Sequence, residues 1–264
     1  MKIFYRISDV SQDPNQSKHK IKGLNNETCL RNFTKVFSQQ VDNFQQPANI
    51  DIYVIADNIC DDTYNMICKY VPESNIQKVS EGNGAATFRI AFNQALQHDD
   101  NEIIYFVEND YLHKPNSYEI LLEGFSLGFP YVTLYDHPDK YMKLHIDGGN
   151  PLADDGAEKT KVYRTASSHW KITNATTMTF AAKVKDLKID EHVIRRWTSG
   201  THPHDFFMFL QIQDNYFGVL THNLYPNQWL RNKRHIICPI PGYSTHGDIK
   251  FVDSLTDWGK YVTS

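Results

Sequence analysis

Apolar residues in the first half of the chain alternate between two patterns. Runs of consecutive apolar and β-branched residues predict buried strands at Met1–Ser8, Ile50–Ala56 and Ile103–Val107. Apolar residues at helical spacing predict helices over Glu27–Phe44, Thr63–Tyr70 and Ala85–Gln97. This alternating order predicts an α/β fold in which helices flank a mostly parallel, doubly wound sheet.

The second half of the chain is less regular. Its apolar, aromatic and β-branched positions predict helices over Pro115–Phe125 and His204–Gln213 and strands over Tyr131–Tyr135 and Ala175–Ala182. We expect loops over His137–Lys161 and from Cys238 onward, where glycine and proline recur. No linker-like stretch divides the chain, so residues 1–264 are interpreted as a single domain.

Polar residues stand at the carboxyl end of every strand predicted in the first half. They are Arg6, Ser8 and Asp9 after the first strand, Asp57 and Asn58 after the second, and Glu108, Asn109 and Asp110 after the third. Open α/β sheets bind their ligands beyond the carboxyl ends of the strands. The sequence therefore predicts a ligand site at this edge of the sheet.

Two of these motifs carry recognisable chemistry. In Glu108-Asn109-Asp110, two carboxylates two residues apart on an extended segment point the same way, as ligands of a hard divalent cation do. Gly82-Asn83-Gly84 precedes a predicted helix, and glycines at a helix N-terminus suit a phosphate. The plain alternatives are a polar turn that ends a strand and an ordinary turn before a helix.

Two later residues are further candidates. Asp205 begins a predicted helix, where it serves either as a cap or as a general base. His246 lies in a glycine-flanked loop and is either a metal ligand or a surface residue.

Charge and composition narrow the classes of function. The 27 basic and 31 acidic residues give a formal net charge of −4, so charge offers no reason to expect a nucleic-acid partner. None of the four cysteines forms a C-x-x-C pair, and reduced thiols are expected. The N-terminal apolar run is too short for a signal peptide, and no stretch has the length of a transmembrane segment. We expect a cytoplasmic protein.

Taken together, these motifs resemble the GT-A glycosyltransferases, especially those of the family two type. The resemblance extends from Met1 to about Asp248, and Phe106–Pro115 is similar to an "E-D-D-Y-L" variant of bacterial and viral sugar transferases. It implies a GT-A fold with a nucleotide-sugar-binding half at residues 1–112. Residues 113–264 would form the acceptor side and carry a metal-binding loop near the C-terminus.

The resemblance also implies roles for individual residues. Donor contacts would come from Arg6, Ser8, Asp57, Asn83, Gly84, Arg89, Glu108 and Asn109. Asp110 and His246 would bind the metal, Mn²⁺ or Mg²⁺, although Glu108 replaces the first aspartate of the family's Asp-x-Asp motif. Asp205 would be the catalytic base, although His204 replaces the acid that usually precedes it.

The implied reaction is metal-dependent, hexosyltransferase-like transfer of a sugar from a nucleotide-sugar. UDP is slightly favoured as the nucleotide, and the acceptor would be a glycan or a lipid-linked hydroxyl. The metal would stabilise the leaving group as a Lewis acid while Asp205 deprotonates the acceptor. In-line attack gives inversion, and retention stays open because Asp205 is assigned by resemblance.

Three other interpretations stay open. A sugar nucleotidyltransferase would make a nucleotide-sugar and release pyrophosphate, but Ser8–Lys22 lacks the glycine-rich loop such enzymes carry. A metal oxygenase or hydrolase would use His145 and Asp147 with His202 or His246, but that chemistry normally occurs on an all-β barrel. A non-catalytic sugar-binding protein would keep the fold alone.

Overall fold

The computed structural model describes residues 1–9, 19–38, 50–142, 153–154, 157–158, 160–213, 234–253 and 255–263. In the first half, four strands and three helices alternate as β1 (Lys2–Ser8), α2 (Asn26–Ser38), β2 (Asp51–Asp57), α3 (Asp61–Cys68), β3 (Ile76–Val79), α4 (Gly84–Ala95) and β4 (Ile103–Glu108). These elements confirm the alternation that the apolar pattern predicts. The predicted helix Glu27–Phe44 extends in part outside the described residues.

The second half supplies the remaining helices and strands. The strands are β5 (Tyr111–His113), β6 (Tyr131–Val132), β7 (Ala153–Asp154), β8 (Ala157–Glu158), β9 (Val162–Arg164), β10 (His169–Thr173), β11 (Phe180–Lys183), β12 (Ile236–Ile240) and β13 (Ser244–His246). The α-helices are α5 (Ser117–Ser126), α6 (Val184–Ile189), α7 (Glu191–Trp197), α8 (Asp205–Ile212) and α10 (Gly259–Val262). In the described chain, no helix is long and apolar enough to span a membrane.

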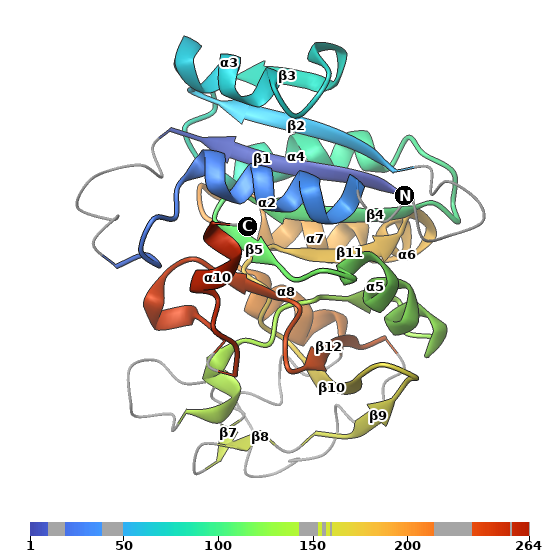
Figure 1. The fold of residues 1–264 in the computed structure, drawn as a ribbon. Helices are drawn as coiled ribbons and strands as arrows, with labels where there is room; N and C mark the ends of the chain where they lie inside the picture. The colour runs from blue at the N-terminus through green and yellow to red at the C-terminus, as the bar shows by residue number, and fades with distance from the viewer. Residues whose placement is uncertain are drawn as a thin grey trace.

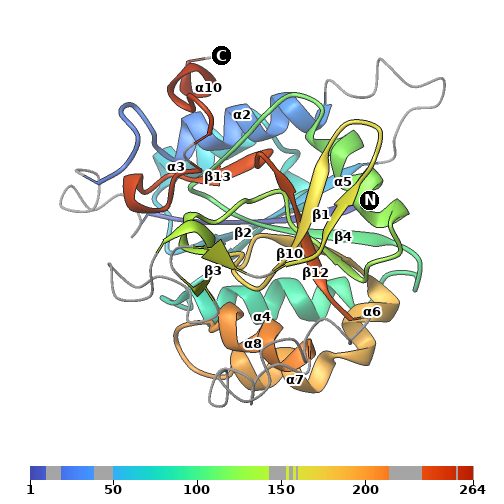
Figure 2. The ribbon, with the colours of Figure 1, turned by 90° about the horizontal axis from the view of Figure 1, so that it is seen from below.

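One sheet organises these elements, in the strand order β3-β2-β1-β4-β11-β6-β12-β10-β9, where β3 is Ile76–Val79. Figures 1 and 2 show α2, α3 and α5 on one face of the sheet, and α4, α6, α7 and α8 on the other. Within the described sheet, only β10 and β11 run opposite to the other strands. The predicted α/β fold with a mostly parallel sheet flanked by helices is therefore confirmed.

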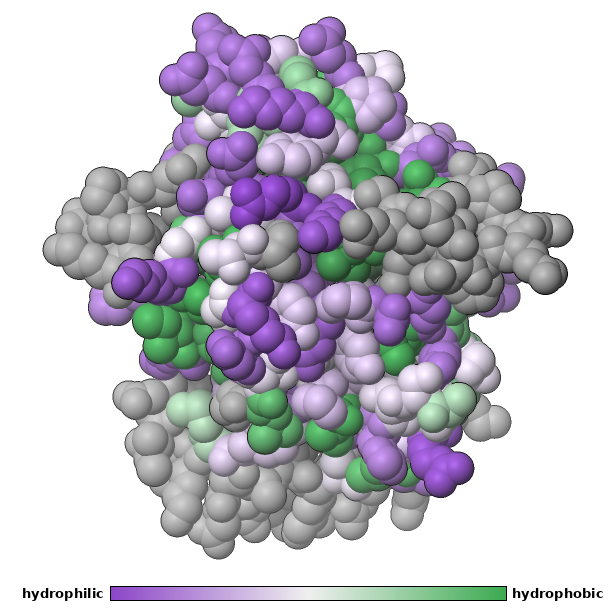
Figure 3. Space-filling model, in the orientation of Figure 1, coloured by the Kyte–Doolittle hydropathy of each residue, from purple (hydrophilic) through white to green (hydrophobic). Residues whose placement is uncertain are grey.

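Alternating side chains of the central strand build two cores. On β1, Ile3, Tyr5 and Ile7 pack into the core under α2, whereas Phe4 packs into the core under α4. This alternation follows from the two-residue period of a strand, and it explains why a strand covered on both faces is apolar throughout. Polar residues cover the end of the molecule formed by α3 and β3 (Figure 3). Exposed Gln77 and Lys78 on β3 there discourage pairing with another strand.

The parallel register brings the strand ends together. Ser8 of β1 pairs with Asp57 of β2, and Arg6 pairs with Glu108 of β4. The polar residues predicted at the carboxyl ends of the strands consequently lie along one edge of the sheet. The prediction of a common edge is confirmed.

Two predictions in the second half were wrong in part. The strand predicted over Ala175–Ala182 begins only at Phe180, because Thr177 and Met178 have left-handed backbone angles (φ 43° and 59°) that a strand cannot adopt. The tail from Cys238 is not simply irregular, since Cys238 lies within β12. Pro239 is tolerated there because β6 pairs only with Ile236 and Ile237, so the next residues of β12 have no β6 partner.

Several other expectations changed. The strand predicted over Tyr131–Tyr135 ends at Val132, and β3, β5, β9, β10, α6 and α7 were not predicted. Within the loop predicted at His137–Lys161, the structure describes a 3₁₀ turn at Pro138–Tyr141 and the short pair β7 and β8. His145 and Asp147, the candidate oxygenase ligands, lie outside the described residues.

We expect the stability of the fold to fall in mild acid because of His113. This residue of β5 is fully buried against the rings of Phe33 and Phe37, and burial lowers its pKa from 6.5 to about 3. Below about pH 6.5 the His113 imidazole therefore binds a proton in the unfolded chain but not in the folded chain. The resulting loss is about 1.4 kcal/mol of unfolding free energy per pH unit, and urea titrations across this range would measure it.

Two variants test whether His113 causes this pH dependence of the unfolding free energy. His113→Leu should remove its own share of the slope between about pH 6.5 and 5 and leave the share of His235, whose pKa burial lowers to about 4. The exposed His192→Gln should leave the slope unchanged. An equal slope in the His113→Leu protein would show that other groups cause the acid sensitivity.

Candidate functional site

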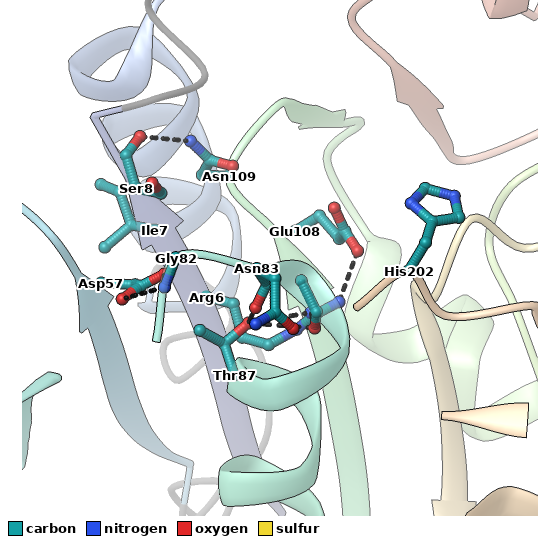
Figure 4. A pocket seen from close by; sticks show the side chains of 11 residues that line it. Arg6, Ile7, Ser8, Asp57, Gly82, Asn83, Thr87, Glu108, Asn109 and His202 are labelled. Atoms are coloured by element: carbon teal, nitrogen blue, oxygen red, sulfur yellow. Dashed lines mark hydrogen bonds and ion pairs between the residues drawn. The ribbon is translucent and has the colours of Figure 1, made fainter. Parts of the chain in front are cut away.

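A pocket of about 400 Å³ opens at the carboxyl edge of the sheet (Figure 4). It is lined by Arg6, Ile7, Ser8, Asp57, Gly82, Asn83, Gly84, Thr87, Glu108, Asn109 and His202. The lining includes every predicted donor-binding residue except Arg89. Sequence order separates these residues by up to two hundred positions, and the parallel register together with the start of α4 brings them together.

A buried guanidinium forms the floor of the pocket. Arg6 is 5% exposed, and its Nη2 lies 2.5 Å from Glu108 Oε1 while its Nη1 donates to the carbonyl of Gly84 at 2.8 Å. Glu108 thus balances the charge of Arg6. The Nε–H of Arg6 is buried without a hydrogen-bond partner, so the guanidinium retains one donor that an oxygen-rich ligand could satisfy.

Asp57 holds the loop that leads into α4. Its carboxylate accepts hydrogen bonds from the backbone N–H groups of Glu81 (2.7 Å) and Gly82 (3.0 Å). Gly82 has φ +68°, a conformation that glycine adopts without strain. Asp57 therefore shapes the pocket wall, and its contact with the donor stays a prediction.

The N-terminus of α4 faces the same pocket. Asn83 is its N-cap, and its side chain accepts the N–H of Ala86 at 2.8 Å. The helix dipole places positive potential at this end, which favours a phosphate. Phosphate binding by Gly82-Asn83-Gly84 stays a prediction, because the Ala86 N–H already bonds to Asn83 and the Ala85 N–H faces the Thr201 carbonyl at 3.4 Å.

Asn109, which lines the pocket, and Arg89, which does not, both form hydrogen bonds to protein groups. The side-chain amide of Asn109 donates to Asn26 Oδ1 at 2.6 Å, which ties the end of β4 to the start of α2. Arg89 donates to the carbonyls of Thr198 and Gly200 from outside the pocket lining. It thereby holds the loop that carries His202, a pocket residue that sequence reasoning considered only for an oxygenase triad.

Asp110 and His246 meet as the sequence predicts. His246 Nε2 lies 3.3 Å from Asp110 Oδ2, because β13 pairs antiparallel with β5 directly after Asp110. The other oxygen, Oδ1, is buried and has no hydrogen-bond partner. A carboxylate with one unsatisfied oxygen fits a hard divalent cation, which takes its other ligands from phosphate and water.

His246 fits this role less directly than Asp110. The Asp248 N–H donates to His246 Nδ1 at 3.0 Å, so a neutral ring carries its proton on Nε2, toward Asp110. Metal ligation through Nε2 would require that proton to move to Nδ1 and the Asp248 hydrogen bond to break. Across the described residues, no group of three or more His, Cys, Asp and Glu side chains is arranged to hold a metal.

Close packing keeps the His246 loop against Asp110. A Cβ atom on Gly247 would lie 2.0 Å from Leu24 Cδ2 and 2.9 Å from the backbone oxygen of Asp110. We expect Gly247→Ala to lower the unfolding free energy by about 1–3 kcal/mol, because a backbone oxygen, unlike the end of a side chain, cannot rotate away from the added methyl group. Urea denaturation would measure the loss.

Gly200→Ala is the matched control for this prediction, since the nearest atoms to its Cβ lie 4.0 Å away. If both glycine variants were equally stable, the loop could not be packed as described.

Asp205 is linked to Asp110 through Tyr111 and a short loop. Asp205 Oδ2 accepts from Thr176 N at 2.7 Å and from Thr176 Oγ1 at 3.0 Å. The hydroxyl of Tyr111, the residue after Asp110, donates to the carbonyl of the same threonine at 3.0 Å. The two left-handed residues that follow Thr176 make this a strained turn, of the kind that functional sites retain.

Both carboxylates also influence one buried phenol. Burial raises the pKa of Tyr135 well above its ordinary value, and nearby carboxylates, Asp110 and Asp205 among them, raise it further. The loop that precedes Asp205 lies against α4, where the Ala85 N–H faces the Thr201 carbonyl at 3.4 Å. The same loop carries His202, which lines the pocket, and it ends at Asp205 in the first turn of α8.

Comparison with known proteins places this site in context. Residues 24–192 match the model of glycosyl transferase family 2. The structure of S. aureus TarS 1-349 is 12% identical, with a TM-score of 0.43 over 90% of this chain and 58% of that chain. The galactosyltransferase LgtC, in complex with donor and acceptor sugar analogs, is 8% identical, with a TM-score of 0.41 over 90% of this chain and 86% of that chain.

The chain thus spans little more than half of the TarS fragment. No curated protein sequence matches it. The family match covers well over half of the residues, from before α2 into α7, and it includes the loop before α4 and the Glu108-Asn109-Asp110 segment. On this evidence the chain belongs to glycosyl transferase family 2.

Proposed function

We propose that this glycosyltransferase moves a sugar from a nucleotide-diphosphate-sugar, with a UDP-sugar favoured, to a hydroxyl of a glycan or lipid-linked acceptor. One observation carries the proposal. The pocket at the strand ends combines a helix N-terminus with the segment that leads into Asp110, and Asp205 is connected to that segment through Thr176 and Tyr111. Such a pocket suits a donor whose diphosphate lies between the strand ends and an acceptor.

The donor phosphates would lie between the N-terminus of α4 and Asp110. Asp110 would hold a Mg²⁺ or Mn²⁺ ion, which when bound neutralises charge on the leaving diphosphate. The unsatisfied Oδ1 of Asp110 supports that assignment. The contribution of His246 in this proposal is to donate its Nε2 proton toward Oδ2 and keep the carboxylate oriented.

Asp205 would act as the general base. Its Oδ2 is occupied by Thr176, so the other oxygen would take the proton from the acceptor hydroxyl. The acceptor oxygen forms a bond to the anomeric carbon, and the bond from that carbon to the diphosphate oxygen breaks. The proton stays on Asp205, the electron pair leaves with the nucleoside diphosphate, and in-line attack inverts the anomeric configuration.

A binding screen tests this proposal. Nucleoside diphosphates and nucleotide-sugars, each with and without Mn²⁺, should raise the melting temperature if they bind the folded chain, and UDP is the first to try. A ligand at about one hundred times its Kd adds about 2.7 kcal/mol. Uridine without phosphates is the control, because the pocket geometry predicts that the diphosphate supplies most of the affinity.

Product analysis then distinguishes transfer of a sugar to an acceptor from synthesis of a nucleotide-sugar. Release of a nucleoside diphosphate marks the proposed reaction, and release of pyrophosphate marks a nucleotidyltransferase. If no nucleotide or nucleotide-sugar stabilises the chain, the proposal is wrong. The acceptor, the donor sugar and a cytoplasmic location stay predictions from the sequence.

A further inference from the structure

A lysine lies beside the proposed diphosphate site. Lys20 Nζ is 3.7 Å from Asp110 Oδ2, and the two side chains are only 14% and 17% exposed. The same oxygen lies 3.3 Å from His246 Nε2. The carboxylate that the resemblance assigns to a metal ion therefore has a positive charge of the protein next to it.

Backbone pairing keeps Lys20 in this position. Its main chain forms an isolated bridge with Asp248, and the flanking residues are tied to the same loop. Ile21 N donates to Gly247 O at 2.9 Å, and Ile249 N donates to His19 O at 2.7 Å. A solvent-exposed ion pair by itself contributes little to stability. Here the backbone hydrogen bonds hold Lys20 and the His246 loop together around Asp110.

We propose that the ammonium group of Lys20 binds the diphosphate of the donor. This inference rests on the proposed function. Before nucleotide binds, Lys20 balances Asp110 and competes with a divalent cation for that carboxylate. When the diphosphate enters, its oxygens offer Lys20 a more highly charged partner, and Asp110 is released. Nucleotide and metal should therefore bind cooperatively, each increasing the affinity of the other by the same factor.

Lys20→Met tests this role because it keeps most of the length of the side chain and removes its charge. Without nucleotide, the variant should bind Mn²⁺ more tightly than the wild type, as measured by the free Mn²⁺ signal in electron paramagnetic resonance. Without metal, it should bind UDP about tenfold or more weakly by calorimetry, since a charge-assisted hydrogen bond to phosphate is lost. The two affinities are thus expected to change in opposite directions.

Two further variants serve as controls. Lys22→Met removes an exposed charge two residues away on the same segment and should leave both affinities unchanged. Lys20→Arg keeps the charge and should retain wild-type behaviour in both measurements. Circular dichroism melting would establish that each variant is folded.

The outcomes separate the two proposals. If wild-type protein binds UDP but Lys20→Met changes either affinity no more than Lys22→Met does, the assignment of Lys20 is overturned. If wild-type protein binds no nucleotide under any condition, the proposed function fails first, independently of Lys20. Opposite changes in Mn²⁺ and UDP affinity would establish the role.

Discussion

Asp205→Asn is expected to reduce turnover by about 10²–10⁴-fold, the usual contribution of a general base. Asparagine keeps the size of the side chain and an oxygen that can accept the Thr176 N–H, so the turn around Thr176 should persist. Donor affinity should change little, because Asp205 lies outside the lining of the donor pocket. Initial-rate kinetics with the donor identified by the binding screen would measure the loss in kcat.

Asp62→Asn is the matched control, since Asp62 is an exposed acid in the first turn of α3, just as Asp205 lies in the first turn of α8. Both substitutions remove a favourable charge from a helix N-terminus, so any general effect on stability is shared. Near-normal turnover in the Asp205→Asn protein would rule out its role as the base. Retained anomeric configuration in the product would contradict the single-displacement mechanism.

Asp110→Asn is expected to cost about 10²–10³-fold in turnover, comparable with the loss of one group that stabilises a developing negative charge. The substitution removes the proposed ligand of the cation and leaves Lys20 beside a neutral amide. Stabilisation by UDP should then lose its dependence on Mn²⁺. Thermal shifts and rates measured with and without Mn²⁺ would give both quantities.

Chelation provides the control for this prediction. Wild-type protein in EDTA and the Asp110→Asn protein in Mn²⁺ should have similarly low rates, because both lack the same cation. If the variant kept a rate that EDTA abolishes in the wild type, the metal ligand would have to be another residue. A wild type insensitive to EDTA would show that the protein's own cations are sufficient.

The donor pocket was largely predictable from sequence because its parts are local patterns. Apolar runs indicate buried strands, and parallel strands end at one edge, so Ser8, Asp57 and Glu108 could be placed together before any coordinates. The Gly82-Asn83-Gly84 turn and the helix after it likewise depend on neighbouring residues. Local sequence therefore indicated most of the polar residues that line the pocket, but it placed Arg89 there wrongly and did not indicate His202 as a donor contact.

Tertiary contacts decided what individual side chains do there. The contacts of Arg89 with the carbonyls of Thr198 and Gly200, and of Asp57 with the loop before α4, depend on where distant backbone lies. Neither the left-handed turn after Thr176 nor the order of β11, β6, β12 and β10 has a local pattern that specifies it. These features follow from packing between segments far apart in the chain.

The sequence by itself determined the α/β class, the edge of the sheet that carries the site and the chemistry of its residues, because apolar periodicity and strand ends are encoded within short segments. Only the tertiary structure decided that Lys20 lies beside Asp110 and that Tyr111 and Thr176 connect Asp110 to Asp205. The physical reason is that Lys20 is positioned by backbone hydrogen bonds to Gly247 and its neighbours, more than two hundred residues away, and no periodicity records such a pairing.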